Sequence, residues 1–214
     1  MRIVAVDIET MGLLHETPLP EITCVCMHDG QRDYAFRLIG RRTPEERAAD
    51  VSAIVALLDE ADVLAGFNAP LFDLEFMRRA FGLDDAHMLR WVLKCVDPFM
   101  CARCLVGAPT RLQHMLELNG LGSKTASGCG AIEMAQAERW DELLAYCSMD
   151  ARLTYELCAL EWFRVTPGLE CRLDWGRSPP RFRLAGNTTA SSPVAPAFAS
   201  EAAWPMMMMT FVEP

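Results

Sequence analysis

Two acidic residues separated by one isoleucine, Asp7 and Glu9, end the first apolar segment of the chain. Because side chains at positions i and i+2 of a strand point to the same face, both carboxylates can reach one point in space. Tyr146 and Asp150 lie four residues apart, so a helix would present them on one face. Asp73 follows a further apolar segment. The spacing predicts four carboxylates and a phenol, carried by three separate elements, in one site.

Such a cluster of carboxylates would repel itself without a counter-charge. Like charges about 4 Å apart cost roughly 4 kcal/mol at an effective dielectric of about 20. Divalent cations bound through oxygen offset this cost, and a carboxylate set without histidine favours Mg²⁺ or Mn²⁺. Two such ions roughly 4 Å apart form the arrangement used for in-line attack on phosphodiesters. The expected chemistry is therefore metal-dependent hydrolysis of nucleic acid.

The elements that must position these residues follow from apolar periodicity and capping signals. A strong helix start occurs where Thr43 can cap, Pro44 takes the first helical position and Glu46 the third. A second capping box is predicted at Thr110 to Gln113. In chain order, the pattern predicts strands at 1–6, 21–27 and 33–38, a helix at 44–60, a strand at 62–67, a helix at 70–81, a strand at 91–96, a helical turn after Pro98, a helix at 110–120, a glycine-rich loop at 120–130 and one long helix at about 138–163.

Three strings occur in order: Asp7-Ile-Glu9, Asn68-x-x-x-Phe72-Asp73 and Tyr146-x-x-x-Asp150. Together they resemble the three exonuclease motifs of the DEDD superfamily, also called DnaQ-like, whose members have a ribonuclease-H-like fold and remove nucleotides from 3′ ends. The tyrosine of the third string resembles the DEDDy branch, which includes the proofreading domains of family-B DNA polymerases. The DEDDh branch would need a histidine where this chain has Ala145. The resemblance spans roughly residues 2–163.

The resemblance implies an α/β fold with a mixed central sheet, in which an antiparallel meander is followed by parallel strands, flanked by helices. We expect this ribonuclease-H-like domain at 1–175 and a flexible tail rich in Pro, Ala, Ser and Met at 176–214. A short apolar patch ends the tail. It fits docking of a protein partner, and a tail that folds back on its own domain or has no role is the alternative.

By the resemblance, Asp7 would bridge two divalent ions, Mg²⁺ or Mn²⁺. Glu9 and Asp150 would complete the shell of the ion that carries the attacking water. Asp73 would hold waters of the second ion or reach it indirectly, and Tyr146 would orient the water through its hydroxyl. Simpler interpretations are a solvated strand end for the first pair, a helix-dipole acid for Asp73 and a core aromatic for Tyr146.

The resemblance also implies contacts with the substrate. The segment after the first strand would offer backbone amides and the Leu13 side chain to the terminal nucleotide. Asn68 and Phe72 would line the substrate groove, and Lys124 would contact a phosphate of the scissile strand. The alternatives are that Phe72 is a core residue and that Lys124 is a surface lysine. The substrate-contact residues expected are Thr10, Met11, Leu13, Asn68, Phe72 and Lys124.

Composition limits the partners and the compartment. The 214 residues carry a net charge of −9, so any contact with nucleic acid must be local and mediated by metal ions and a few cations. The nine cysteines are read as reduced thiols in a cytoplasmic or nuclear protein. Cys101 and Cys104 form a single CxxC without a second pair, which favours packing or surface thiols over zinc. The apolar start is interrupted at Asp7, and no run of about 18 apolar residues exists, so neither a signal peptide nor a membrane span is expected.

The function expected is a stand-alone, metal-dependent 3′–5′ exonuclease that acts on single-stranded 3′ ends by a two-metal mechanism. DNA is favoured over RNA because the resemblance is to polymerase proofreading domains. Three alternatives stay open: a 3′–5′ exoribonuclease similar to ribonuclease D, a non-catalytic nucleic-acid-binding module of the same fold, and an endonuclease or resolvase.

Overall fold

The computed structural model describes residues 1–40, 42–122, 129–160, 162–174 and 181–184. Lys124 and residues 185–214 lie outside the described residues. The predictions made for that lysine and for the tail therefore stay predictions.

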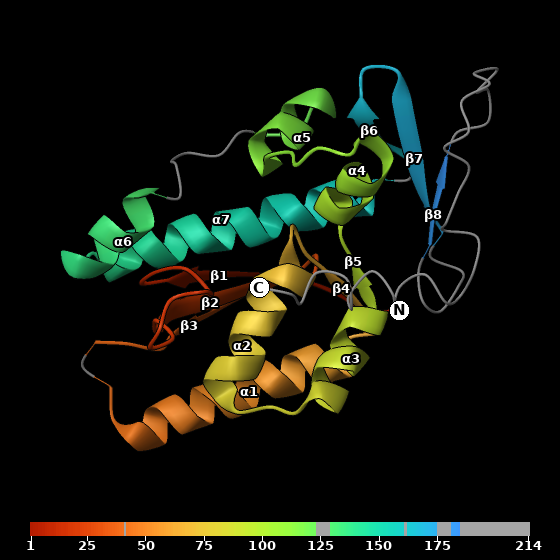
Figure 1. Cartoon of the computed structure of the whole chain (residues 1–214). Coiled ribbons are helices and arrows are strands. Elements are labelled where there is room, and N and C mark those ends of the chain that lie inside the picture. Colours follow the sequence, from red (N-terminus) through yellow and green to blue (C-terminus); the bar gives the residue numbers. More distant parts are fainter. Residues whose placement is uncertain (41, 123–128, 161, 175–180, 185–214) are drawn as a thin grey trace.

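A five-stranded mixed sheet forms the centre of the molecule (Figure 1). Its strands are β1 (Ile3–Thr10), β2 (Ile22–His28), β3 (Asp33–Arg37), β4 (Val63–Ala65) and β5 (Cys95–Val96). They lie in the order β3-β2-β1-β4-β5, with antiparallel pairing from β1 to β3 and parallel pairing of β4 with β1 and of β5 with β4. The predicted mixed sheet, which opens as an antiparallel meander, is confirmed.

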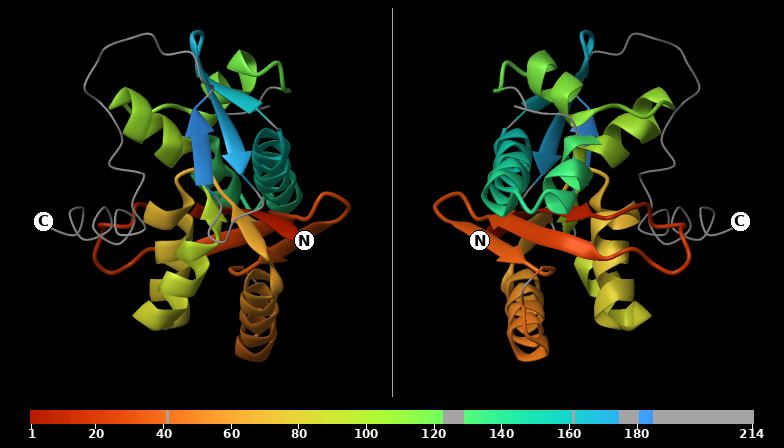
Figure 2. Two further views of the ribbon diagram at one scale, coloured as in Figure 1. Left: turned by 90° about the vertical axis from the view of Figure 1, so that its right-hand side faces the viewer. Right: turned by 90° about the vertical axis from the view of Figure 1, so that its left-hand side faces the viewer.

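Helices cover both faces of this sheet, as the views in Figures 1 and 2 agree. On one face lie α1 (Pro44–Glu60), α2 (Asp73–Phe81) and α3 (Asp85–Leu93). The long helix α7 (Trp140–Ala159) crosses the other face. Above that face lie α4 (Pro98–Val106), α5 (Leu112–Leu118) and α6 (Cys129–Gln136), and a 3₁₀ turn, η1 (Ala69–Leu71), precedes α2.

The alternation of β1 decides which residues meet α7. Val4, Val6 and Ile8 are buried in the core cluster beneath the sheet, together with residues of α1 and α2. The intervening positions, which include Asp7 and Glu9, therefore point to the opposite face, where α7 packs. The apolar residues of this strand thus fix the direction of its two acids.

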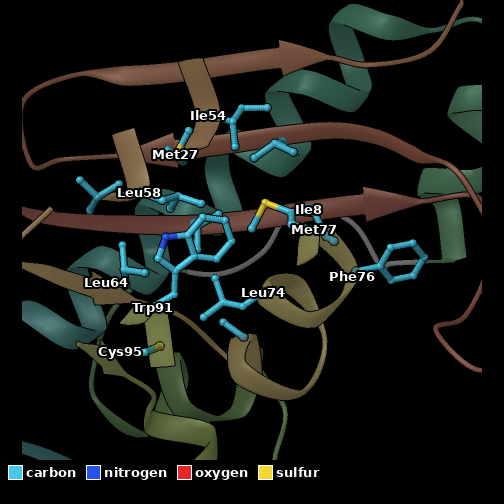
Figure 3. Packing of buried hydrophobic residues seen from close by; sticks show 14 of the residues in the cluster. Ile8, Met27, Ile54, Leu58, Leu64, Leu74, Phe76, Met77, Trp91 and Cys95 are labelled. Carbon is cyan, nitrogen blue, oxygen red and sulfur yellow. The ribbon is translucent and has the colours of Figure 1, made fainter. Parts of the chain in front are cut away.

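The core beneath the sheet is built around the fully buried Trp91, which Figure 3 shows among the side chains of the cluster. Its indole Nε1 donates a 2.7 Å hydrogen bond to Asp59 Oδ1. The strand predicted over residues 91–96 is confirmed only at Cys95–Val96, because Asp84 caps a helix that runs to Leu93. A short buried apolar run fits either element by periodicity alone.

Of the two predicted capping boxes, one is confirmed. Thr43 Oγ1 accepts from the Glu46 backbone N–H, and the Glu46 carboxylate accepts from the Thr43 N–H. The box predicted at Thr110 was wrong, because Arg111 is the N-cap of α5 and makes no side-chain capping bond. Helix α5 is instead held by its buried residues Leu112 and Met115.

A second, three-stranded antiparallel sheet follows α7. It consists of β6 (Trp162–Thr166), β7 (Leu169–Asp174) and β8 (Arg181–Leu184). The long helix predicted to reach residue 163 ends at Ala159, because Phe163 and Val165 alternate with exposed neighbours and are buried in strand geometry. β8 pairs with β7, so residues 181–184, which fall within the predicted tail at 176–214, belong to this sheet.

Two further observations bear on the expectations from composition. None of the helices in the described residues combines the length and the apolar character needed to cross a bilayer. Eight of the nine cysteines, all except Cys129, are free thiols. Of the CxxC pair, Cys101 is buried with its sulfur 3.6 Å from that of Cys171.

Candidate active site

The carboxyl end of β1 and the middle of α7 bring three acids together. One carboxylate oxygen from each of Asp7, Glu9 and Asp150 lies within 4.8 Å of the other two. Asp150 is buried, with 2% of its surface exposed. These are three of the four acids that the sequence predicts in one site, and their role as metal ligands stays a prediction.

Packing of α7 against the sheet accounts for this convergence. Leu143, Cys147 and Ala151 recur at four-residue steps and are fully buried against β2. The Cys147 thiol also donates a 3.3 Å hydrogen bond to the backbone carbonyl of Asp7. Because Asp150 lies one turn beyond this contact, the helix has to present its carboxylate to the strand that carries the other two.

The phenol of Tyr146 completes the α7 side of the site. Its side chain is 5% exposed and makes a hydrogen bond with Asp150, four residues later on the same face. Burial, followed by the charges of Asp150, Glu9 and Asp7, raises the pKa of the Tyr146 phenol above its ordinary value. This tyrosine is therefore a protonated hydroxyl at neutral pH, able to donate to an oxygen in the site.

Asp73 contacts the backbone of the strand that carries Asp7 and Glu9. As the first residue of α2, it places its Oδ1 3.0 Å from the backbone N–H of Ile8, from which it accepts a hydrogen bond. It is not a member of the three-carboxylate cluster found in the described residues. The pKa of the Asp73 carboxyl is raised to about 7, mainly by burial and further by the nearby charge of Asp97.

Asp97, a fully buried acid that the sequence analysis did not single out, holds the turn before Asp73. Its Oδ2 accepts from the Ala69 N–H at 2.8 Å, and its Oδ1 accepts from the Met100 N–H at 3.0 Å. Asp97 thereby caps α4 and anchors η1, the turn that leads into Asp73. Burial raises the pKa of the Asp97 carboxyl to about 6, although the backbone hydrogen bonds act in the other direction. Asp97 followed by Pro98 is a sequence signal for the N-cap of a helix. No sequence signal indicates the hydrogen bond from the Ala69 N–H to Asp97.

A cavity of about 330 Å³ adjoins the acids at the end of β1. Four of the residues predicted to contact substrate line it, namely Thr10, Met11, Leu13 and Phe72, alongside Glu9, Glu16 and Ile132. Asn68 is not among the lining residues of this cavity. It adopts a left-handed conformation with φ of 69°, and its carbonyl accepts from the Phe72 N–H at 3.0 Å, so it shapes the turn before α2.

The loop that forms the cavity is held by Glu16. Its Oε1 accepts from the Leu13 N–H at 2.6 Å, and the Met11 N–H donates to the Glu21 carbonyl at 2.9 Å. These two amides are engaged within the chain, contrary to the expectation that they face the substrate. A Cβ on Gly12 would lie 2.7 Å from Glu16 Oε1 and 2.9 Å from Pro20 Cγ, so a larger residue would force one of these side chains to shift. Leu13, with 55% of its surface exposed, does present its side chain.

The donor set of the cluster fits hard divalent cations. Three carboxylates within 4.8 Å of one another, without a histidine or thiol among them, are the oxygen ligands that Mg²⁺ and Mn²⁺ prefer. Their mutual repulsion is roughly 3–4 kcal/mol per charged pair at an effective dielectric of about 20. A bound cation would convert this repulsion into attraction.

Comparisons with known proteins place the fold. A family B DNA polymerase from the hyperthermophilic archaeon Pyrobaculum calidifontis superposes with a TM-score of 0.55 and 19% identity, over 74% of this chain and 24% of the polymerase. A zinc-bound complex of E. coli exonuclease I with single-stranded DNA gives a TM-score of 0.42 at 21% identity, over 68% of this chain and 42% of that one. Product-bound exonuclease I gives 0.41 at 21% identity, over 68% and 45%.

The chain thus spans less than half the length of each of these proteins. No protein-family model and no curated protein matches the sequence. The superposition on the polymerase shows that this chain shares the fold of a part of that enzyme.

Proposed function

We propose that this chain is a metal-dependent 3′–5′ exonuclease of the DEDDy branch, which removes nucleotides from single-stranded 3′ ends, with DNA favoured as substrate. The observation that carries the proposal is the convergence of Asp7, Glu9 and Asp150 beside a cavity at the end of β1. The fold shared with part of a family B DNA polymerase supports it. The order of the three motif strings supports the branch.

Two divalent ions, Mg²⁺ or Mn²⁺, are the cofactors proposed for the carboxylate cluster. Asp7, Glu9 and Asp150 would hold them directly, and Asp73 would act from beside the Ile8 backbone, through waters or after a small shift. Bound ions would acidify a coordinated water and neutralise charge on the scissile phosphate. The protein's own contribution is to hold the acids rigidly, because each comes from a packed strand or helix.

Tyr146 orients the nucleophile in this proposal. Its hydroxyl is held by Asp150 and keeps its proton, because burial and the neighbouring acids disfavour the phenolate. A phenol in this state is a hydrogen-bond donor and acceptor, and it is a poor general base at neutral pH. It therefore positions a water beside the carboxylates.

The cavity is the proposed site of the terminal nucleotide. Met11 and Phe72 offer apolar surface to a base or sugar, and the exposed Leu13 side chain stands at its edge. Glu9 lies in its wall and belongs to the metal-binding cluster as well. A nucleotide seated here would place its phosphate beside the acids.

Digestion of labelled strands tests the proposal. DNA and RNA of one sequence, labelled at the 5′ end, are incubated with the protein and Mg²⁺ or Mn²⁺, and in parallel with a chelator. Asp150→Asn removes one ligand charge, and Glu156→Gln, at an exposed acid of the same helix, is the matched control.

The expected result is a ladder of single-nucleotide steps that requires the metal, is lost in Asp150→Asn and is kept in Glu156→Gln. Discrete internal cuts would point to an endonuclease. Intact oligonucleotides with both metals, or equal activity of the two variants, would overturn the proposal. Faster digestion of RNA than of DNA would overturn the preference for DNA.

A further inference from the structure

Three cysteines form a second cluster of metal-ligating atoms on the same face of the sheet. The sulfur atoms of Cys24, Cys26 and Cys147 all lie within 4.8 Å of one another. Each of the three residues is fully buried, with none of its surface exposed. Two of the thiols donate to backbone carbonyls: that of Cys26 to Leu144 at 3.7 Å and that of Cys147 to Asp7 at 3.3 Å.

Strand register places this thiol cluster next to the acids. In the antiparallel pair of β1 and β2, Cys24 is opposite Glu9 and Cys26 is opposite Asp7. Directly opposed side chains point to the same face of a sheet, with Cβ atoms about 5 Å apart. The exonuclease proposal uses the acids of β1 and leaves the neighbouring sulfurs of β2 without a role.

The two clusters differ in the kind of metal ion that they suit. Carboxylates select hard ions such as Mg²⁺ and Mn²⁺, whereas thiolates select soft ions such as Cu(I) and Zn²⁺. Structural zinc sites almost always have four protein ligands, and catalytic zinc sites keep an open position for water. Within the described residues this group offers three ligating side chains and no exposed surface. Three sulfur atoms in a site closed to solvent fit a soft metal ion with a coordination number of three.

We propose that Cys24, Cys26 and Cys147 form a buried binding site for a monovalent thiophilic metal ion, Cu(I), coordinated by three sulfur atoms. Each sulfur gives up its thiol proton when it coordinates, so one Cu(I) displaces up to three protons and affinity rises with pH. The weak hydrogen bonds from the thiols to the carbonyls of Leu144 and Asp7 are lost at the same time. The site ties β2 to α7 directly behind the carboxylates.

Competition with a chromophoric Cu(I) chelator tests the site in the full chain. Under anaerobic conditions, the chelator reports how much Cu(I) the protein withholds, and no nucleic acid is present. Cys24→Ala and Cys147→Ala each remove one sulfur. Cys158→Ala is the matched control, because Cys158 is a fully buried cysteine of α7 that is not in the cluster.

The expected result is one tightly held Cu(I) in the wild type and in Cys158→Ala. In Cys24→Ala and Cys147→Ala the affinity should fall by at least the roughly 10- to 100-fold that the loss of an outer-shell partner costs, because a direct ligand is removed. Equal withholding of Cu(I) by Cys147→Ala and Cys158→Ala would overturn the proposal. Retention of Zn²⁺ at these cysteines in preference to Cu(I) would overturn the three-coordinate assignment.

A second measurement needs no variant and therefore does not depend on whether an alanine variant folds. The copper-edge X-ray absorption spectrum of the wild-type protein loaded with one equivalent of Cu(I) should show three sulfur neighbours. Two sulfur neighbours, or nitrogen and oxygen neighbours, would contradict the site. Because both measurements are made without substrate, failure of the exonuclease proposal leaves them unaffected.

Discussion

The carboxylate of Asp73 accepts a 3.0 Å hydrogen bond from the backbone N–H of Ile8, the residue between Asp7 and Glu9. The N-terminus of α2 is thereby joined to the strand that carries two of the clustered acids. A shift of this helix would be transmitted to the strand through one hydrogen bond. The same contact holds a carboxyl group in a buried position, where its charge is costly.

The state of Asp73 should appear as a pH dependence of stability. Burial raises the pKa of this carboxyl from its ordinary value of 3.8 to about 7 in the folded chain. The folded state therefore binds a proton that the unfolded chain releases, so this group's stabilising contribution is present below about pH 4 and is lost as the pH rises towards 7. Asp73→Asn keeps an acceptor for the Ile8 N–H and has no proton to lose.

Thermal unfolding of the wild type and of Asp73→Asn, in chelator between pH 4 and 8, measures this effect. The melting temperature of the variant relative to the wild type should rise with pH and level off above about pH 7. A difference that stays constant over this range would show that the Asp73 carboxyl is already ionised in the folded chain at low pH.

Asp97 should be more sensitive to an amide substitution than another acid with the same capping role. Both of its oxygens accept backbone N–H groups, so Asp97→Asn directs an amide N–H₂ at a donor in a buried place. We expect a loss of about 1–3 kcal/mol in the free energy of unfolding. Asp84 is the control: it is exposed, caps α3 through one bond to the His87 N–H, and asparagine caps equally well.

Urea titration of the two variants gives the comparison, from the transition midpoint and the slope. Asp84→Asn should stay within about 0.5 kcal/mol of the wild type. If the two substitutions cost the same, the bond from Ala69 to Asp97 contributes nothing to holding the turn before Asp73.

The sequence predicted an element correctly where its signal lies within a few neighbouring residues. The Thr43 capping box is a local device, and it formed as predicted. The hairpin of β6 and β7 was missed, although Trp162 to Thr166 alternates exposed and buried residues and Pro167-Gly168 is a turn signal. Its apolar residues also continued the helical spacing of α7. The boundary was set by the burial of Phe163 in a core formed by distant elements.

The site was predictable where spacing alone brings side chains to one face. Asp7 with Glu9, and Tyr146 with Asp150, needed only the periods of strand and helix. Asp97 could not be assigned in this way, because its bond to the Ala69 N–H joins residues distant in the sequence. The engagement of the Leu13 amide by Glu16 also depends on how the loop folds back, which no periodic pattern encodes.

Tyr146→Phe should lower the rate of cleavage and leave binding nearly unchanged. The substitution removes the hydroxyl that is held by Asp150 and keeps the buried ring. Misplacing a reacting group by about 1 Å can cost about 10²-fold in rate, and we expect a loss of this order. Tyr155→Phe is the control on the same helix, where the ring packs edge-on against His28 at 5.1 Å.

Steady-state kinetics on a 5′-labelled strand separate the two effects. The expected result is a fall in kcat with little change in KM for Tyr146→Phe, and wild-type values for Tyr155→Phe. Since burial raises the pKa of the Tyr146 phenol, the wild-type rate should show no loss from its ionisation near pH 10. A large rise in KM for Tyr146→Phe would assign this tyrosine to substrate binding.

Two substitutions of Glu16 should change the KM for the nucleic-acid substrate in opposite directions. Its Oε1 holds the Leu13 N–H at 2.6 Å, and its carboxylate adds negative charge to the wall of the cavity. Glu16→Gln keeps the acceptor and removes the charge, so the repulsion of a phosphate should weaken and KM should fall several-fold. Glu16→Ala removes the acceptor as well, so the loop that carries Leu13 loses its tether and KM should rise. The gain in Glu16→Gln should shrink as salt screens the charge. If KM is unchanged in both variants, the nucleotide does not occupy this cavity.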